Sequence, residues 1–237
     1  IVRQQQELLE LSTPVVKLWN GILALPLIGS LDSARTQVVM QNLLQQILAT
    51  EAEIATIVEK IPAHELAIQW DCSTEVQDAY GSIPGFPLAG AIERNLGELR
   101  NLSPRIPADV ALGYHFCFGT LGGWPRFQPD DLGQAVALAN GFVAASGRRV
   151  DWIHLPVLDR SDDAFFHPLA GLKPDGARVY LGAIHNMARF KERVATARKF
   201  LPRFGLGAYC GFGRLSREEL PQILDDHCEA VETAQLR

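Results

Sequence analysis

Strand-sized apolar segments and amphipathic helices alternate regularly along the chain from Leu66 to its end. The segments that we expect to be strands are short and apolar: Ala67–Trp70, Val110–Phe116, Val150–Leu155, Val179–Ile184 and Gly205–Tyr209. Helices are expected over Leu88–Leu102, Pro129–Ser146, Asp162–Ala170 and Ala188–Phe200, with a last helix that opens at Ser216. Such alternation is typical of a parallel sheet with helical crossovers. We therefore predict an α/β fold with parallel strands and outer helices.

The first part of the chain has a different pattern. Val15–Trp19 and Ile22–Ile28 are apolar and strand-sized, and the Asn20-Gly21 pair between them is a strong hairpin signal. A helix capped by Asp32 or Ser33 should follow. One face of that helix would bury the apolar residues Val39, Leu43 and Ile47. The segment Ala49–Ile61 fits a short strand or a helix, and we favour the helix.

Composition excludes several classes of protein. The 237 residues carry a net charge of −5, so no broad cationic field predicts nucleic-acid binding. No apolar run approaches the roughly 20 residues of a membrane span, and no secretory signal is visible. The four cysteines are too few and too scattered for a disulfide framework. Free thiols in a reducing cytoplasm are the better interpretation.

Polar and thiol side chains follow the predicted strands. They are Asp71 and Cys72 after the first strand, His115 and Cys117 at the second, His154 on the third, His185 after the fourth and Cys210 after the fifth. In TIM-type barrels, functional residues lie at the C-terminal ends of strands. These positions are therefore the candidate site.

His115 and Cys117 are two residues apart, so on a strand they point to the same face. With Cys210 they would supply one imidazole and two thiolates to a metal ion. Zinc takes such ligands, and a catalytic site keeps one position open, where a substrate thiol becomes a nucleophilic thiolate. The alternative is a packed cysteine beside a hydrogen-bonded histidine. Cys72 and Cys228 are expected to be structural.

Two further motifs have two interpretations each. Asp71 follows an apolar strand, which favours a functional role, but it could instead cap a helix. The segment Gly211–Arg214 could cradle a phosphate, although a strand-to-helix turn is the better interpretation.

The region from about Thr56 to Val231 resembles the C-terminal barrel of cobalamin-independent methionine synthases and their smaller relatives. The motifs that carry the resemblance are Ile68-Gln69-Trp70-Asp71, Tyr114-His115-Phe116-Cys117 and Tyr209-Cys210-Gly211-Phe212-Gly213. The resemblance implies zinc ligation by His115, Cys117 and Cys210, and substrate contact by Asp71. His185 is assigned to substrate binding as well.

The chain departs from that family in two respects. The family has a glutamate zinc ligand on the strand between the cysteine motifs, whereas this strand reads Val150-Asp151-Trp152-Ile153-His154. His154 is therefore our candidate for a fourth protein ligand, since imidazole binds zinc well. Only about five strands of an eight-stranded barrel are found, so we expect a partial or rearranged TIM-type barrel.

The first 55 residues resemble the start of a STAS domain, the family of anti-sigma-factor antagonists and stressosome proteins. Leu9–Val16 and Leu25–Asp32 carry this resemblance. We therefore expect an incomplete STAS-like segment over residues 1–55, with a β-hairpin and a helix, and an incomplete barrel over 56–237. A natural or engineered fusion would join them within Leu48–Val58.

Three functions follow from these patterns. The first is a zinc-dependent methyl or alkyl transferase that acts on a small thiol, without nucleic-acid or membrane partners. The second is a non-enzymatic STAS-type regulator or scaffold, and the third is a chimera without activity. An open sheet edge exposes unpaired backbone groups, so a homo-oligomer that covers it is also expected.

Overall fold

A computed structural model describes residues 16–19, 22–24, 51–85, 87–120, 123–212 and 216–235. The chain divides into two compact units, Ile1–Pro62 and Ala63–Arg237. The boundary at Pro62 lies a little beyond residue 55, where the sequence placed it. Each unit is described by itself.

The first unit contains a pair of strands and a helix. β1 (Val16–Trp19) pairs antiparallel with β2 (Ile22–Ala24), as the hairpin prediction requires. Residues 51–60 are helical, which confirms the helical interpretation of the ambiguous segment. The predicted Asn20-Gly21 turn and the helix with Val39, Leu43 and Ile47 lie outside the described residues.

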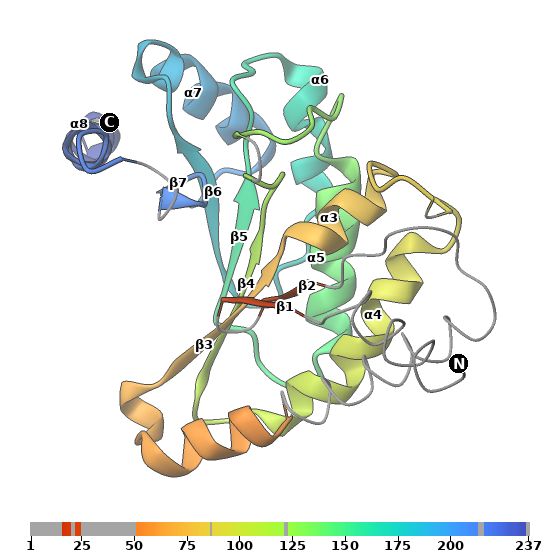
Figure 1. The fold of residues 1–237 in the computed structure, drawn as a ribbon. Helices are drawn as coiled ribbons and strands as arrows, with labels where there is room; N and C mark the ends of the chain where they lie inside the picture. The colour runs from red at the N-terminus through yellow and green to blue at the C-terminus, as the bar shows by residue number, and fades with distance from the viewer. Residues whose placement is uncertain are drawn as a thin grey trace, which may run out of the picture. The chain divides into compact units, whose positions relative to one another are not determined.

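The second unit is built on a five-stranded parallel sheet with its strands in chain order (Figure 1). The strands are β3 (Ala67–Cys72), β4 (Ala111–Phe116), β5 (Trp152–Pro156), β6 (Arg178–Ile184) and β7 (Gly205–Ala208). All four pairings are parallel, so the predicted strands are indeed parallel neighbours. The described strands form an open sheet whose edges are β3 and β7.

Helices connect these strands, and a further helix follows β7. They are α3 (Ser73–Ala79), α4 (Ala91–Leu102), α5 (Gly133–Ala145), α6 (Asp163–Phe166), α7 (Phe190–Phe200) and α8 (Leu220–Gln235). Short 3-10 turns lie at η1 (Ala63–Glu65), η2 (Ser103–Arg105), η3 (His167–Gly171) and η4 (Met187–Arg189). Figure 1 shows α3, α4 and α5 on one side of the sheet, and α7 packs on β6. Parallel neighbours in chain order, joined by right-handed crossovers, place their helices on one face.

The sheet therefore has a covered face and an open face. On these strands, every second side chain points toward the helices. These side chains are buried and form the core: Leu112, Tyr114, Phe116, Ile153, Leu155, Val179 and Leu181. The side chains between them point to the other face and are more exposed, as the alternating burial of β3 and the start of β5 shows. The open face is where the candidate site residues Asp71, His115 and His154 point.

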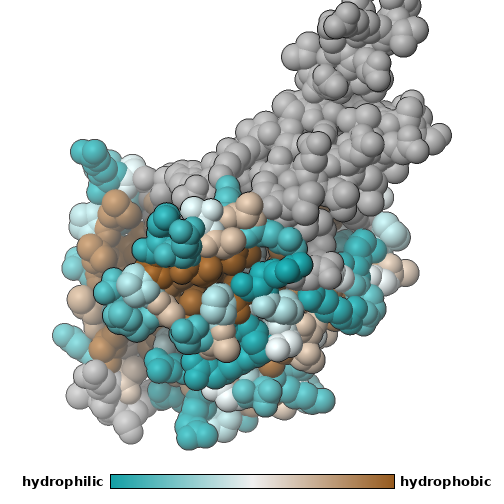
Figure 2. Space-filling model, turned by 90° about the horizontal axis from the view of Figure 1, so that it is seen from below, coloured by the Kyte–Doolittle hydropathy of each residue, from teal (hydrophilic) through white to brown (hydrophobic). Residues whose placement is uncertain are grey.

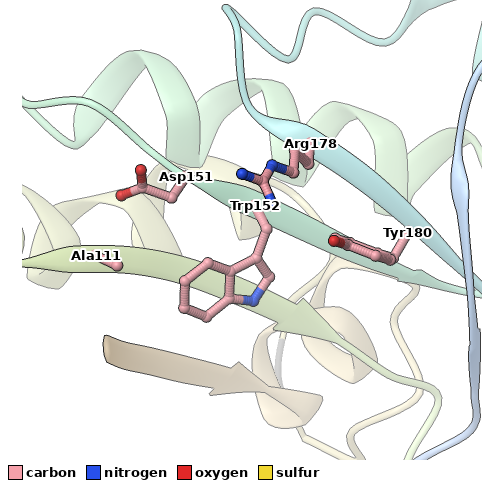
Figure 3. Close-up of a pocket in the computed structure, with 5 residues that line it drawn as sticks. All are labelled: Ala111, Asp151, Trp152, Arg178 and Tyr180. Carbon is pink, nitrogen blue, oxygen red and sulfur yellow. The ribbon is translucent and has the colours of Figure 1, made fainter. Parts of the chain in front are cut away.

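Aromatic side chains lie across glycines on this open face. A Cβ atom at Gly113 would come within 1.8 Å of the Trp152 indole, and one at Gly205 within 2.4 Å of the Tyr180 ring. The indole nitrogen of Trp152 donates to Gln69 at 3.1 Å. These rings border a shallow pocket near the start of β4, β5 and β6, which Ala111, Asp151, Trp152, Arg178 and Tyr180 line (Figure 3).

Replacing Gly113 by alanine should destabilise the second unit by about 1–3 kcal/mol, because the new methyl group must displace Trp152. The matched control is Gly97→Ala in α4, where a Cβ atom meets nothing within 4 Å. That substitution should stabilise the chain by about 0.5–1 kcal/mol, because alanine loses less conformational entropy in a helix. Urea unfolding measures both variants. A shift of both midpoints in the same direction would contradict this account of the sheet.

Hydrophobic side chains also reach the surface. On α8, Leu220, Leu224 and Val231 are exposed, and Figure 2 shows hydrophobic areas set among hydrophilic residues on the face seen from below. Among the described helices, none combines the length and the apolar character needed to cross a bilayer.

Candidate metal centre

The site lies at the C-terminal ends of β4 and β7. His115 is the fifth residue of β4, and Cys117 follows the end of that strand. Cys210 comes two residues after β7 ends at Ala208. His115 is 8% exposed and Cys117 is 5% exposed, while Cys210 is half-buried. Solvent therefore reaches the site from the side of Cys210.

The three side chains converge. Among the described residues, His115, Cys117 and Cys210 form the one group of potential metal ligands whose ligand atoms all lie within 4.8 Å of one another. Two strands, β5 and β6, separate β4 from β7. In a flat sheet, strands three places apart are about 14 Å from each other. The convergence therefore requires the chain from β4 to β7 to curve, so that the segments after these two strands approach each other.

The two thiols are hydrogen bonded. The Sγ of Cys210 donates to the Sγ of Cys117 at 2.9 Å, and the backbone N–H of Gly119 donates to the same sulfur at 3.3 Å. Together with His115, the Cys210 thiol lowers the pKa of Cys117 to about 5. The hydrogen bond to the Cys117 sulfur and burial raise the pKa of Cys210. Of this pair, Cys117 is therefore the more acidic thiol.

The sulfur–sulfur distance is shorter than the one expected around bound zinc. Two thiolates on one zinc ion with bonds of roughly 2.3 Å should lie about 3.5–4 Å apart. In this structure the two sulfurs are 2.9 Å apart. Loading a divalent metal must remove the thiol proton and move the two sulfurs about 0.6–1.1 Å further apart.

The histidines of β4 and β5 form a second pair. His115 and His154 are directly opposite in the parallel register, and their Nδ1 atoms are 2.5 Å apart. His154 is not in the group of converging ligands, although the sequence made it the fourth candidate. Burial, and next the neighbouring His115, lowers the pKa of His154 to about 3. The His154 ring is therefore neutral under physiological conditions.

Asp71 lies beside this centre on β3, opposite His115 in the register. Its carboxylate accepts a hydrogen bond from Gln69 at 2.9 Å, and Gln69 in turn accepts from Trp152. The charge of Asp71 contributes to the raised pKa of Cys210, which places the carboxylate near that thiol. Asp71 is exposed, so it can contact a ligand.

His185 lies at the end of β6, in an aromatic cluster. Its Nε2 is 2.8 Å from the carbonyl oxygen of Val157. Burial lowers the pKa of His185 to about 4, and the nearby Arg193 adds to this effect. Its ring contacts Trp124, which stacks on Tyr209 at a centroid distance of 4.5 Å. The assignment of His185 to substrate binding stays a prediction.

Sequence reasoning did not find two residues around the site. Trp124 lies in the loop after β4, and Gly119 donates to the Cys117 sulfur. Neither follows a strand directly, so a rule based on strand ends cannot find them.

Gly211 has a φ of +90°, and a Cβ atom there would come within 2.6 Å of Thr120. This favours the turn interpretation of that motif, whose residues Gly213 and Arg214 lie outside the described chain.

The other two cysteines are Cys72 and Cys228. Cys72 is buried, and burial raises its pKa above the ordinary value. Cys228 is exposed on α8. Neither belongs to the converging group.

The chain matches no protein-family model, no curated protein and no solved structure. The resemblances to methionine synthases and to STAS domains therefore stay predictions.

Proposed function

We propose that the protein binds zinc through His115, Cys117 and Cys210, and that it transfers a methyl or alkyl group to a small thiol. The observation that carries the proposal is the convergence of these three side chains within 4.8 Å at the C-terminal edge of the sheet. Three protein ligands are what a catalytic zinc site provides, because the fourth position is kept for substrate.

The residues fit the ion. The Nε2 of His115 is buried and has no hydrogen-bond partner. A buried nitrogen without a partner is costly, and a metal bond would satisfy it. The lowered pKa of Cys117 favours the thiolate, which is the form that binds metals. One imidazole and two sulfurs also form a soft donor set, which binds zinc in preference to magnesium or calcium.

The proposed reaction needs little more from the chain. Zinc, when bound, lowers the pKa of a substrate thiol and keeps it in the nucleophilic thiolate form. Cys210 provides the solvent-facing side by which the thiol enters, and the Asp71 carboxylate would hold a cationic amino group of the substrate. The sulfur then attacks the alkyl carbon, so that a sulfur–carbon bond forms and the bond to the leaving group breaks.

We also propose that the curled sheet is a segment of a TIM-type barrel. Its sequential strand order, its helices on one face and its functional residues at the strand ends support this interpretation. Residues 1–55 would then be the STAS-like segment of the resemblance.

The test is thiol binding by the zinc-loaded protein. At pH 7 a free thiol is mostly protonated, so binding as a thiolate should release close to one proton per thiol. Homocysteine should bind more tightly than 3-mercaptopropionate, which lacks the amino group. Asp71→Asn should reduce this preference by about tenfold, the value of a charge-assisted hydrogen bond.

Methyl iodide serves as a simple donor in the same assay. The zinc-loaded protein should accelerate its reaction with homocysteine, with iodide leaving and the thiol proton passing to the buffer. Zinc-loaded protein that neither releases protons with thiols nor accelerates methylation would refute the transferase proposal while leaving the metal site intact.

A further inference from the structure

The contact between His115 and His154 determines where one proton can be. Two nitrogens 2.5 Å apart share a single hydrogen, so one Nδ1 donates and the other accepts. The ring centroids are 4.6 Å apart and the planes differ by 29°.

The outer nitrogens of the pair are not equivalent. The Nε2 of His115 and the Nε2 of His154 are both buried, and neither has a hydrogen-bond partner. Only His115 belongs to the group that converges with the two sulfurs. Its Nε2 is the nitrogen left free for a metal, because its Nδ1 is engaged with His154.

His154 is held in a slot between strands. A Cβ atom at Gly207 would come within 3.0 Å of the His154 Nε2, and one at Gly182 within 3.2 Å. Glycine at both positions leaves room for the ring, which therefore lies over β6 and β7. The ring is directed at His115 rather than at the two sulfurs.

We propose that His154 is a positioning residue for the metal centre and not its fourth ligand. It accepts the Nδ1–H of His115 and so fixes the tautomer in which the His115 Nε2 lone pair faces the metal. This inference rests on the proposed metal-binding function. It leaves the fourth position to the substrate, because the His154 imidazole is engaged with His115.

The inference predicts how substitutions at His154 rank. An asparagine places its Oδ1 close to the former Nδ1 and can accept the same proton, whereas leucine cannot. Residues that hydrogen-bond to a metal-bound histidine contribute about 10–100-fold in metal affinity. His154→Leu should therefore weaken cobalt and zinc binding by about that factor, and His154→Asn should recover most of the loss.

The experiment uses the full chain, freed of metal and reduced, and titrated with Co²⁺ and then with Zn²⁺ in competition with a chelating dye. Circular dichroism and thermal unfolding establish that each variant is folded. NMR of the zinc-loaded protein with ¹⁵N-labelled histidine gives the readout that a merely structural role would not change. One ring, that of His115, should show a zinc-bound Nε2 and a protonated Nδ1.

Each outcome separates the two proposals. A zinc-bound nitrogen on His154 would make it a ligand and overturn the inference, while the metal site stands. Folded His154→Leu with wild-type affinity would also overturn it. A folded wild-type chain that binds neither metal would refute the metal site, and the positioning role would fall with it.

Discussion

Cys117→Ser and Cys210→Ser should each abolish stoichiometric metal binding. The wild-type chain, purified under reducing conditions with zinc present, should contain about one zinc ion per molecule. Each substitution replaces a sulfur ligand by a hydroxyl, which is a poor ligand for zinc in this geometry. Since removal of a residue that only hydrogen-bonds to a ligand costs about 10–100-fold in affinity, loss of a direct ligand should exceed about 100-fold. Elemental analysis after gel filtration measures the zinc.

The control is Cys228→Ser, which removes an exposed thiol on α8. That variant should retain the zinc of the wild type. The structure makes the two site cysteines interdependent, because their sulfurs are 2.9 Å apart. Wild-type protein without zinc, in which the site thiols titrate freely while the chain is folded, would show that the centre holds no metal.

Much of the sheet could be predicted because its covered face leaves a clear signal. Buried residues such as Leu112 and Tyr114 on β4, and Ile153 and Leu155 on β5, are large and apolar, and short apolar runs bounded by turns are typical of buried parallel strands. The expected strands agree with β3 to β7 to within two residues at each end.

The helix α3 was missed. It spans Ser73–Ala79, and its buried residues are Val76, Asp78 and Ala79. A helix of two turns with so little apolar surface has no detectable period. Its buried charge is satisfied by a distant residue, since Arg94 of α4 donates to Asp78 at 2.7 Å. Such a long-range ion pair cannot be seen in the local pattern.

The ligands could be predicted, but their arrangement could not. His115 and Cys117 follow from the alternation of side chains along a strand, and Cys210 from its place after another strand. Whether they meet depends on the curvature of four strands, which the local sequence does not encode in any simple pattern. Likewise, the spacing of His115 and His154 cannot show that their Nδ1 atoms face each other; that follows from the register of β4 and β5.

The second large effect is expected at Arg193, a charged residue that is completely buried in α7. Its guanidinium donates to the carbonyl oxygens of Ala183 and His185, both at 2.8 Å, and to the Asp159 carboxylate at 2.7 Å. These bonds join the loop after β5 to the end of β6. The sequence gives no sign of this role, because lysines and arginines in α7 read as a solvated helix face.

Arg193→Met should lower the free energy of unfolding by about 2–4 kcal/mol. Methionine fills much of the same volume, but two carbonyl oxygens and a carboxylate lose their donor. Asp159 is partly exposed, so water can hydrate it again, which keeps the expected loss below that of a fully buried pair. Urea unfolding followed by circular dichroism measures the change.

Lys191→Met is the matched control, because it makes the same kind of change at an exposed position of the same helix. Its effect should stay within about 0.5 kcal/mol. The Arg193 guanidinium also donates to the backbone carbonyl of His185, whose ring contacts Trp124. Arg193→Met should therefore disturb the aromatic cluster of Trp124 and Tyr209. Tryptophan fluorescence measures this disturbance. Equal midpoints for the two variants would mean that the carbonyl groups find other donors and that Arg193 does not hold this edge of the sheet together.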